Sequence, residues 1–267
     1  MPAINLARLR SQTAQLSEDF EDPKAFIHAL HDLLDLYAER THRPGQSGTP
    51  PPLIKSYSVP KPVLRQIALG ITPLVKSKSS KALALCDALW EVPYLEFRLL
   101  AVSILGLIPP EPPDIVFSRI DKWGPSITED QILAALMQQG LTSIRQESSK
   151  LLVVLIDDWL SSSETISQKM GLHALSPLLS DSNFENLPVF YRLLTPFVRN
   201  VSSQIRPYVL DVLKALARRS PQETAYFLHQ NLEVPDNPDT AWLIRHSLHE
   251  FPITNQDRLR EAIRNIE

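Results

Sequence analysis

A helix is predicted from about Tyr94 to Leu107, where the apolar residues follow a helical pattern that continues to Ile108. They recur at i, i+3, i+4, i+7, i+8 and i+11, which is one face of a helix, and are Phe97, Leu100, Ala101, Ile104, Leu105 and Ile108. Leu99 and Val102 lie off that face, so the helix is apolar on nearly all sides. Because such a helix needs neighbours to cover it, the segment indicates a stacked array of helices.

Proline and glycine usage favours an all-α fold. The chain has 23 prolines and 7 glycines, and it contains no Asn-Gly or Asp-Gly pair of the kind that closes β-hairpins. The prolines gather between the periodic segments, where they start and stop helices. We therefore expect helices throughout.

The helices form a repeat. Taking the second helix of each pair, the pattern places five of them near Glu96–Leu107, Thr128–Gly140, Glu164–Leu179, Ser203–Arg219 and Asp239–Glu250. Their starts recur every 32 to 39 residues, which is typical of HEAT-like two-helix units that bury their apolar faces by stacking. The prediction is an α-solenoid of such repeats.

We expect one domain over residues 1–267. Its parts are an N-terminal helical pair (1–42), a Pro/Gly-rich loop (43–54), the repeats (55–250) and a capping helix (251–267).

Composition indicates whether the chain can form a packed core and in which compartment it is expected. Apolar residues make up 43% and charged residues 21% of the chain, which is enough for a packed core. The single cysteine, Cys86, excludes an internal disulfide and favours the cytoplasm. The longest apolar run, Leu151–Ile156, is too short to span a membrane. We expect a monomer that has no membrane segment and needs no cofactor.

Charge is unevenly distributed along the chain. The net charge is −3, yet no acidic residue lies between Arg40 and Cys86, and that segment carries eight Lys or Arg residues. Such a segment can attract a phosphate backbone, or it can be a solvated surface without a ligand. A second basic cluster is formed by Lys214, Arg218 and Arg219.

Three stretches together resemble a known family. They are SVPKPVLRQI (58–67), LWEVPYLEFRLLAVSIL (89–105) and IRPYVLDVLKALARRSPQETAYFLHQN (205–231). They are similar to the bacterial DNA alkylation repair glycosylases built from HEAT-like repeats. The resemblance implies a C-shaped solenoid whose concave, basic surface holds duplex DNA. It also implies an activity that releases N3- or N7-alkylated purines without flipping the base.

Release of a cationic alkylpurine requires a carboxylate that stabilises an oxocarbenium-like sugar and a positioned water. By resemblance, the matching carboxylate is Asp130; the alternative is an ordinary acidic residue in the first turn of a helix. The pattern departs from the family elsewhere. Ser126 and Asp211 stand at expected tryptophans, Trp123 is displaced upstream, and Lys169 replaces an arginine. An inner face without aromatic side chains could bind DNA while catalysis is lost.

Eight cations are the predicted DNA-binding residues: Lys61, Arg65, Arg98, Lys169, Arg206, Lys214, Arg218 and Arg245. The rival hypothesis is a non-enzymatic scaffold that holds a protein or peptide partner, as solenoids commonly do. No metal site is expected, because the pairs His28/His31 and His246/His249 lack a third ligand. The four tryptophans, Trp90, Trp123, Trp159 and Trp242, are expected in the core.

Overall fold

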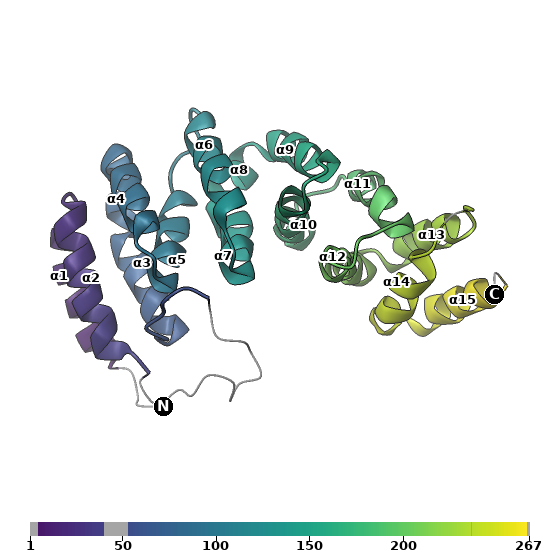
Figure 1. Cartoon of the computed structure of the whole chain (residues 1–267), viewed down its shortest axis with the longest axis horizontal. Coiled ribbons are helices and arrows are strands. Elements are labelled where there is room, and N and C mark those ends of the chain that lie inside the picture. Colours follow the sequence, from purple (N-terminus) through teal and green to yellow (C-terminus); the bar gives the residue numbers. More distant parts are fainter. Residues whose placement is uncertain (1–4, 40–52, 236, 266–267) are drawn as a thin grey trace. The chain divides into compact units, whose positions relative to one another are not determined.

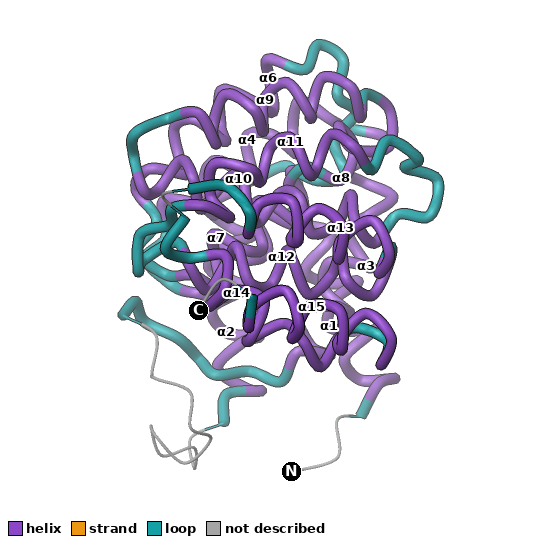
Figure 2. The backbone as a smooth tube through the Cα atoms, turned by 90° about the vertical axis from the view of Figure 1, so that its right-hand side faces the viewer, coloured by secondary structure: helices purple, strands orange, loops and turns teal. Residues whose placement is uncertain are grey.

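The computed structural model describes residues 5–39, 53–235 and 237–265. Across these ranges the chain folds into helices, and an isolated bridge between Lys55 and Tyr94 is the one β-type contact (Figure 2). The all-α prediction is therefore confirmed. The chain divides into two compact units, Met1–Ser149 and Lys150–Glu267 (Figure 1).

Unit 1 contains two rows of helices. Helix α3 packs against α1 and α5, α5 packs against α7, and α2 packs against α4. We call α3, α5 and α7 the unit 1 row. The elements are α1 (Leu6–Glu18), α2 (Pro23–Tyr37), α3 (Lys61–Ser77), α4 (Ser79–Glu91), α5 (Leu95–Leu105), α6 (Asp114–Trp123), a 3₁₀ turn η1 (Gly124–Ser126), α7 (Asp130–Ala135), a π-helical turn η2 (Leu136–Gly140) and α8 (Thr142–Glu147).

Unit 2 has the same two-row arrangement. Helices α10, α12 and α14 form one row, which we call the unit 2 row, and α11, α13 and α15 form the other. The elements are α9 (Ser149–Ser161), α10 (Thr165–Ser180), α11 (Pro188–Arg199), α12 (Arg206–Arg219), α13 (Pro221–Leu232), α14 (Thr240–Ser247), a 3₁₀ turn η3 (Leu248–Glu250) and α15 (Ile253–Arg264).

The repeat pattern agrees with these helices. The five predicted second helices are α5, α7 with η2, α10, α12 and α14 with η3, and they begin at residues 95, 130, 165, 206 and 240. The N-terminal pair is α1 and α2, and Asp22 caps α2 by accepting bonds from the N–H groups of Lys24 and Ala25. The predicted capping helix is α15. Of the predicted loop 43–54, residues 43–52 lie outside the described part of the chain.

Three prolines lie inside helices of the described chain rather than at their ends. Pro73, Pro177 and Pro196 lie inside α3, α10 and α11, contrary to the expectation that prolines only start or stop helices. Each lies within the last five residues of its helix. Because only a few helical residues follow each proline, the missing backbone N–H group disturbs little of the helix.

Helix α5 is buried as its apolar pattern predicts. Seven of its apolar residues are buried, on more than one face: Leu95, Phe97, Leu100, Ala101, Val102, Ile104 and Leu105. The helix ends at Leu105 rather than at the predicted Leu107, and the backbone at Gly106 lies directly against η2. A Cβ atom on Gly106 would lie 1.9 Å from the carbonyl oxygen of Gln139. No side chain fits between these two backbones.

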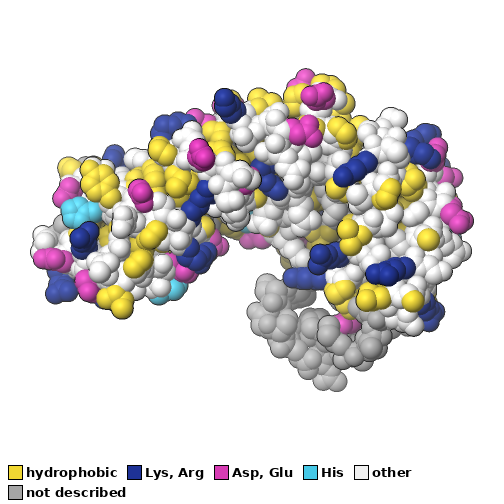
Figure 3. Space-filling view, turned by 180° about the vertical axis from the view of Figure 1, so that it is seen from behind, with side chains coloured by type: hydrophobic (Ala, Val, Ile, Leu, Met, Phe, Trp, Pro, Cys, Tyr) yellow, Lys and Arg dark blue, Asp and Glu magenta, His cyan; other side chains and the backbone are white. Residues whose placement is uncertain are grey.

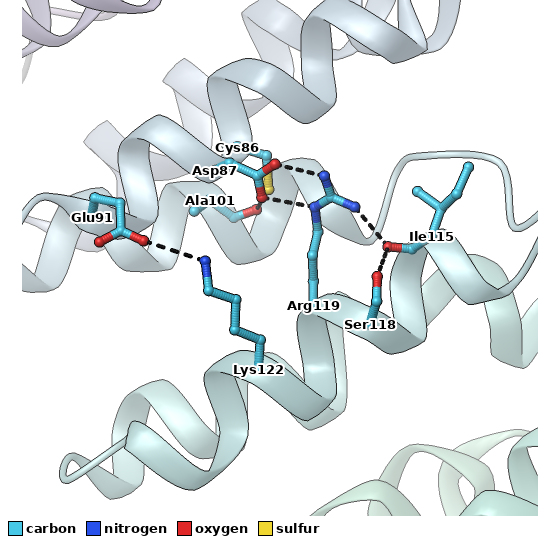
Figure 4. A network of polar contacts seen from close by, with 8 residues as sticks. All are labelled: Cys86, Asp87, Glu91, Ala101, Ile115, Ser118, Arg119 and Lys122. Carbon is cyan, nitrogen blue, oxygen red and sulfur yellow. Dashed lines mark hydrogen bonds and ion pairs between the residues drawn. The ribbon is translucent and has the colours of Figure 1, made fainter.

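A polar network joins α4 and α6 (Figure 4). Arg119 holds Asp87 with two parallel bonds, Nε to Oδ1 at 2.8 Å and Nη2 to Oδ2 at 2.6 Å. This carboxylate raises the pKa of Arg119. Next to it, the fully buried thiol of Cys86 donates to the carbonyl of Ala101 at 3.1 Å, and burial raises the pKa of that thiol.

None of the helices in the described part of the chain combines the length and the apolar character needed to cross a bilayer.

Gly106→Ala tests the contact between α5 and η2. The added methyl group must displace the backbone of η2, so we expect the free energy of unfolding to fall by about 2 kcal/mol. Urea denaturation measures this change. Gly140→Ala is the control, because the nearest atom to a Cβ there would be a methyl carbon at the end of the Leu136 side chain, at 3.2 Å. An equal loss in both variants would contradict the proposed constraint.

The variants Arg119→Met and Lys122→Met compare the stability that two kinds of ion pair contribute. Arg119 forms two hydrogen bonds to Asp87, whereas Lys122 forms one exposed contact with Glu91. Arg119 is 19% exposed, whereas Lys122 and its partner Glu91 are each 72% exposed and 3.7 Å apart. We expect losses of about 1–2 kcal/mol for Arg119→Met and below about 0.5 kcal/mol for Lys122→Met, measured by thermal and urea unfolding. Similar losses would show that the two-bond geometry adds no stability.

Candidate nucleic-acid interface

Cations and aromatic rings alternate across the unit 2 row. The Lys169 ammonium of α10 lies 5.0 Å from the centre of the Tyr208 ring of α12. His173, one turn beyond Lys169, meets the same ring edge-on at 5.0 Å. Lys169 and Tyr208 lie in the N-terminal halves of their helices, and His173 lies in the middle of α10.

The same arrangement repeats between α12 and α14. The Arg206 guanidinium lies 5.0 Å from the Trp242 ring, which stacks on His246 at 3.8 Å and 22°. Arg206 also pairs with Asp239 at 2.5 Å. Asp239 is only 8% exposed, and its other oxygen accepts the N–H group of Val201 at 2.7 Å. Arg206 is therefore held in one orientation.

We call these residues the cation–aromatic strip: Lys169, His173, Arg206, Tyr208, Trp242 and His246. The sequence predicts Trp242 in the core, and this prediction is wrong, because Trp242 is half-exposed beside Arg206. The tryptophans expected by resemblance are absent at Ser126 and Asp211, but Tyr208 is half-exposed beside Lys169. The spacing of four residues in Lys169/His173 and Trp242/His246 was the available signal. Trp90, Trp123 and Trp159 are buried as expected.

The remaining cations of unit 2 differ in their roles. Lys214 is half-exposed and forms no ion pair with any described residue, whereas Arg218 pairs with Glu250 at 2.9 Å. Arg245 is exposed on α14. Arg219 bonds to backbone carbonyls at the end of α10, including that of Leu179 at 2.7 Å. It therefore completes that helix end instead of facing a ligand.

In unit 1, Arg98 covers an aromatic pair. Its guanidinium lies 5.2 Å from the Trp90 ring, and Trp90 stacks on Trp123 at 4.2 Å and 7°. Both rings are buried. Arg98 thus has a packing role that its spacing along the sequence did not reveal.

Lys61 and Arg65 border a groove in the unit 1 row rather than a basic surface. The groove has a volume of about 710 Å³ and lies over α3, α5, α7, η2 and α8. Its lining is mainly aliphatic and includes Leu64, Leu69 and Leu99. The predicted basic segment is therefore interrupted here by leucine side chains.

Asp130 is the first residue of α7 and is exposed. Its neighbour Glu129 accepts the backbone N–H groups of Leu53 and Ile54, the latter at 3.2 Å. Trp123 is buried against Trp90, so its ring does not reach the surface near Asp130. The structure therefore supplies an accessible carboxylate, but not a tryptophan from the preceding segment.

Residues 53–59, which we call the strap, cross the N-terminal ends of α5 and α7. Tyr57 stacks on Tyr94 at 5.1 Å, and its hydroxyl lies 2.6 Å from Nδ1 of His31. Burial lowers the pKa of His31 and raises that of Tyr57, so both stay neutral at pH 7. Ser56 donates to the buried Glu96 at 2.8 Å. No motif in the sequence marked these contacts.

Within the described residues, no three His, Cys, Asp or Glu side chains are arranged to hold a metal ion. On the face shown in Figure 3, Lys and Arg side chains are interspersed with Asp and Glu. Because charges of both signs are mixed on this face, the attraction of an anionic ligand depends more on where individual cations lie than on the net charge.

Comparison with known proteins agrees with the three motifs in the sequence. No curated protein matches the chain. A family model, described as DNA alkylation repair enzyme, matches residues 51–251, which is most of the chain. The chain therefore belongs to the DNA alkylation repair enzyme family.

Proposed function

We propose that this protein binds duplex DNA and that unit 2 provides the main contact surface. The observation that carries the proposal is the cation–aromatic strip across α10, α12 and α14. Lys and Arg neutralise phosphates, and helix N-termini add positive potential beside them. Arg206, Tyr208 and Trp242 lie in the first turns of α12 and α14, and Lys169 lies in the second turn of α10.

The partners of Arg206 suit it to a phosphate contact. Asp239 and Trp242 hold the guanidinium in place before DNA arrives, so little side-chain entropy is lost on binding. Lys214, Arg218 and Arg245 extend the cationic surface beyond the strip.

This surface is narrower than the one predicted from the sequence. We leave out Arg98, because it packs on Trp90, and Lys61 and Arg65, because they border an aliphatic groove. The curved superhelix implied by the family resemblance, the monomeric state and the cytoplasmic location stay predictions.

Asp130 is the carboxylate to which we assign any excision of alkylated purines. Its exposure at the start of α7 supports the assignment. The buried position of Trp123 means that excision here would proceed without that ring against the lesion. Retention of DNA binding with loss of excision is the rival form of the same proposal.

Lys214→Gln tests the DNA surface. Removing one phosphate contact should weaken binding several-fold and reduce the slope of log K against log salt by about one. Fluorescence anisotropy with a labelled duplex, started at about 50 mM salt, measures both quantities. Lys150→Gln on α9 is the matched control, because Lys150 is exposed outside the unit 2 row. Absence of binding by the unaltered protein at this salt would overturn the proposal.

Asp130→Asn tests excision. If Asp130 stabilises the sugar cation, release of 7-methylguanine from methylated duplex DNA should fall by at least about 100-fold, while DNA affinity changes little. Asp114→Asn, another exposed carboxylate at a helix start, is the control. Unchanged release in Asp130→Asn would remove Asp130 from the role. No release by the unaltered protein would restrict the function to binding.

A further inference from the structure

The start of α7 is bonded to the strap. Glu129 is the residue before this helix, and Asp130 is its first residue. The Glu129 side chain does not cap α7. Its Oε1 atom instead accepts the backbone N–H groups of Leu53 and Ile54, the latter at 3.2 Å. Ile54 lies 75 residues before Glu129 in the chain, so a distant segment holds this helix end.

The first turn is the least buried part of α7. Asp130 and Gln131 are exposed, and burial of the helix begins at Ile132. The helix has six residues before η2, and a helix of this length is marginal by itself. The carbonyl of Glu129 accepts the N–H groups of Ile132 at 3.0 Å and Leu133 at 3.1 Å. The position of Glu129 therefore decides where α7 begins.

The strap is in turn fixed on α5. The Lys55 carbonyl accepts the N–H group of Leu95 at 2.9 Å, and the Ser56 hydroxyl donates to Glu96 at 2.8 Å. The N–H group of Ser58 donates to the same Ser56 oxygen at 2.9 Å. Ser58 has a φ of 55°, a left-handed conformation that a residue with a side chain keeps only where its surroundings stabilise it. The strap is therefore a firm support for Glu129.

Excision of an alkylated purine requires an exactly placed carboxylate. The anion must lie against the sugar as positive charge develops there, and a misplacement of about 1 Å can slow a reaction about 100-fold. A carboxylate at the end of a short helix loses its place when that end frays. The bonds from the strap oppose fraying at the residue next to Asp130.

We propose that Glu129 is a positioning residue for Asp130. By accepting the N–H groups of Leu53 and Ile54, it fixes the first turn of α7 and holds the Asp130 carboxylate in one place. Glu129 acts through the backbone and does not touch the reacting sugar. The inference rests on the excision role proposed for Asp130 and adds the group that orients it.

Glu129→Ala and Glu129→Gln separate positioning from direct catalysis. Glutamine keeps an oxygen that accepts the strap N–H groups but carries no charge, whereas alanine removes the acceptor. In single-turnover release of 7-methylguanine from methylated duplex DNA, Glu129→Ala should be slower by about 30-fold or more and Glu129→Gln by no more than about threefold. Because both variants remove the same charge, any change in DNA affinity should be equal in the two. Glu147→Ala, which alters an exposed glutamate at the end of α8, is the matched control and should keep the original rate.

Hydrogen exchange follows the helix start without relying on catalysis. The amides of Ile132 and Leu133 bond to the Glu129 carbonyl, so Glu129→Ala should raise their exchange rates at least about tenfold, whereas Glu129→Gln should leave them nearly unchanged. The amide of Leu100, inside α5, should keep its protection in both variants, which shows that unit 1 stays folded.

The outcomes distinguish this inference from the proposed function. Equal losses of release in both Glu129 variants would make Glu129 a reacting carboxylate and overturn its positioning role. Release or exchange that is unchanged in Glu129→Ala, while Asp130→Asn abolishes release, would overturn this inference and leave the proposed excision standing. No release by the unaltered protein would overturn both.

Discussion

Burial of α5 on more than one face is the constraint on which unit 1 depends. A helix of this kind cannot lie at a surface, because its exposed apolar area would cost about 25 cal/mol for each Å² left in water. Helices α3, α4 and α7 supply the cover. The end of α5 then meets η2 so closely that only glycine fits at position 106. This contact fixes the η2 wall of the groove that lies over α3, α5 and α7.

The two units use similar rows of helices for different surface chemistry. In the unit 2 row, cations lie against aromatic rings at the surface, and an almost buried carboxylate orients Arg206. In the unit 1 row, the cation at the comparable place, Arg98, covers rings in the core, and leucines reach the surface instead. One scaffold therefore presents a polar surface in one unit and an apolar one in the other. Membership of a DNA repair family does not by itself explain the apolar surface of unit 1.

The helices could be predicted because their signals are local. Apolar spacing of three and four residues located all five second helices, and three short motifs indicated the family. The predictions that failed concern contacts between residues that are far apart in the sequence. Arg206 meets Trp242 from another helix, and Glu129 bonds to the strap more than 70 residues earlier in the chain. Residue types alone do not reveal which rings face a cation and which, like Trp123, are stacked inside.

The burial of Cys86 has a practical consequence for studying this chain. Its thiol is fully covered and bonded to the carbonyl of Ala101, and its raised pKa keeps it from forming the reactive thiolate. Since the sequence contains no second cysteine, a cysteine introduced on an exposed helix position would be the sole group open to maleimide dyes. Fluorophores can therefore be placed at one chosen point on either unit while the native sulfur stays in position.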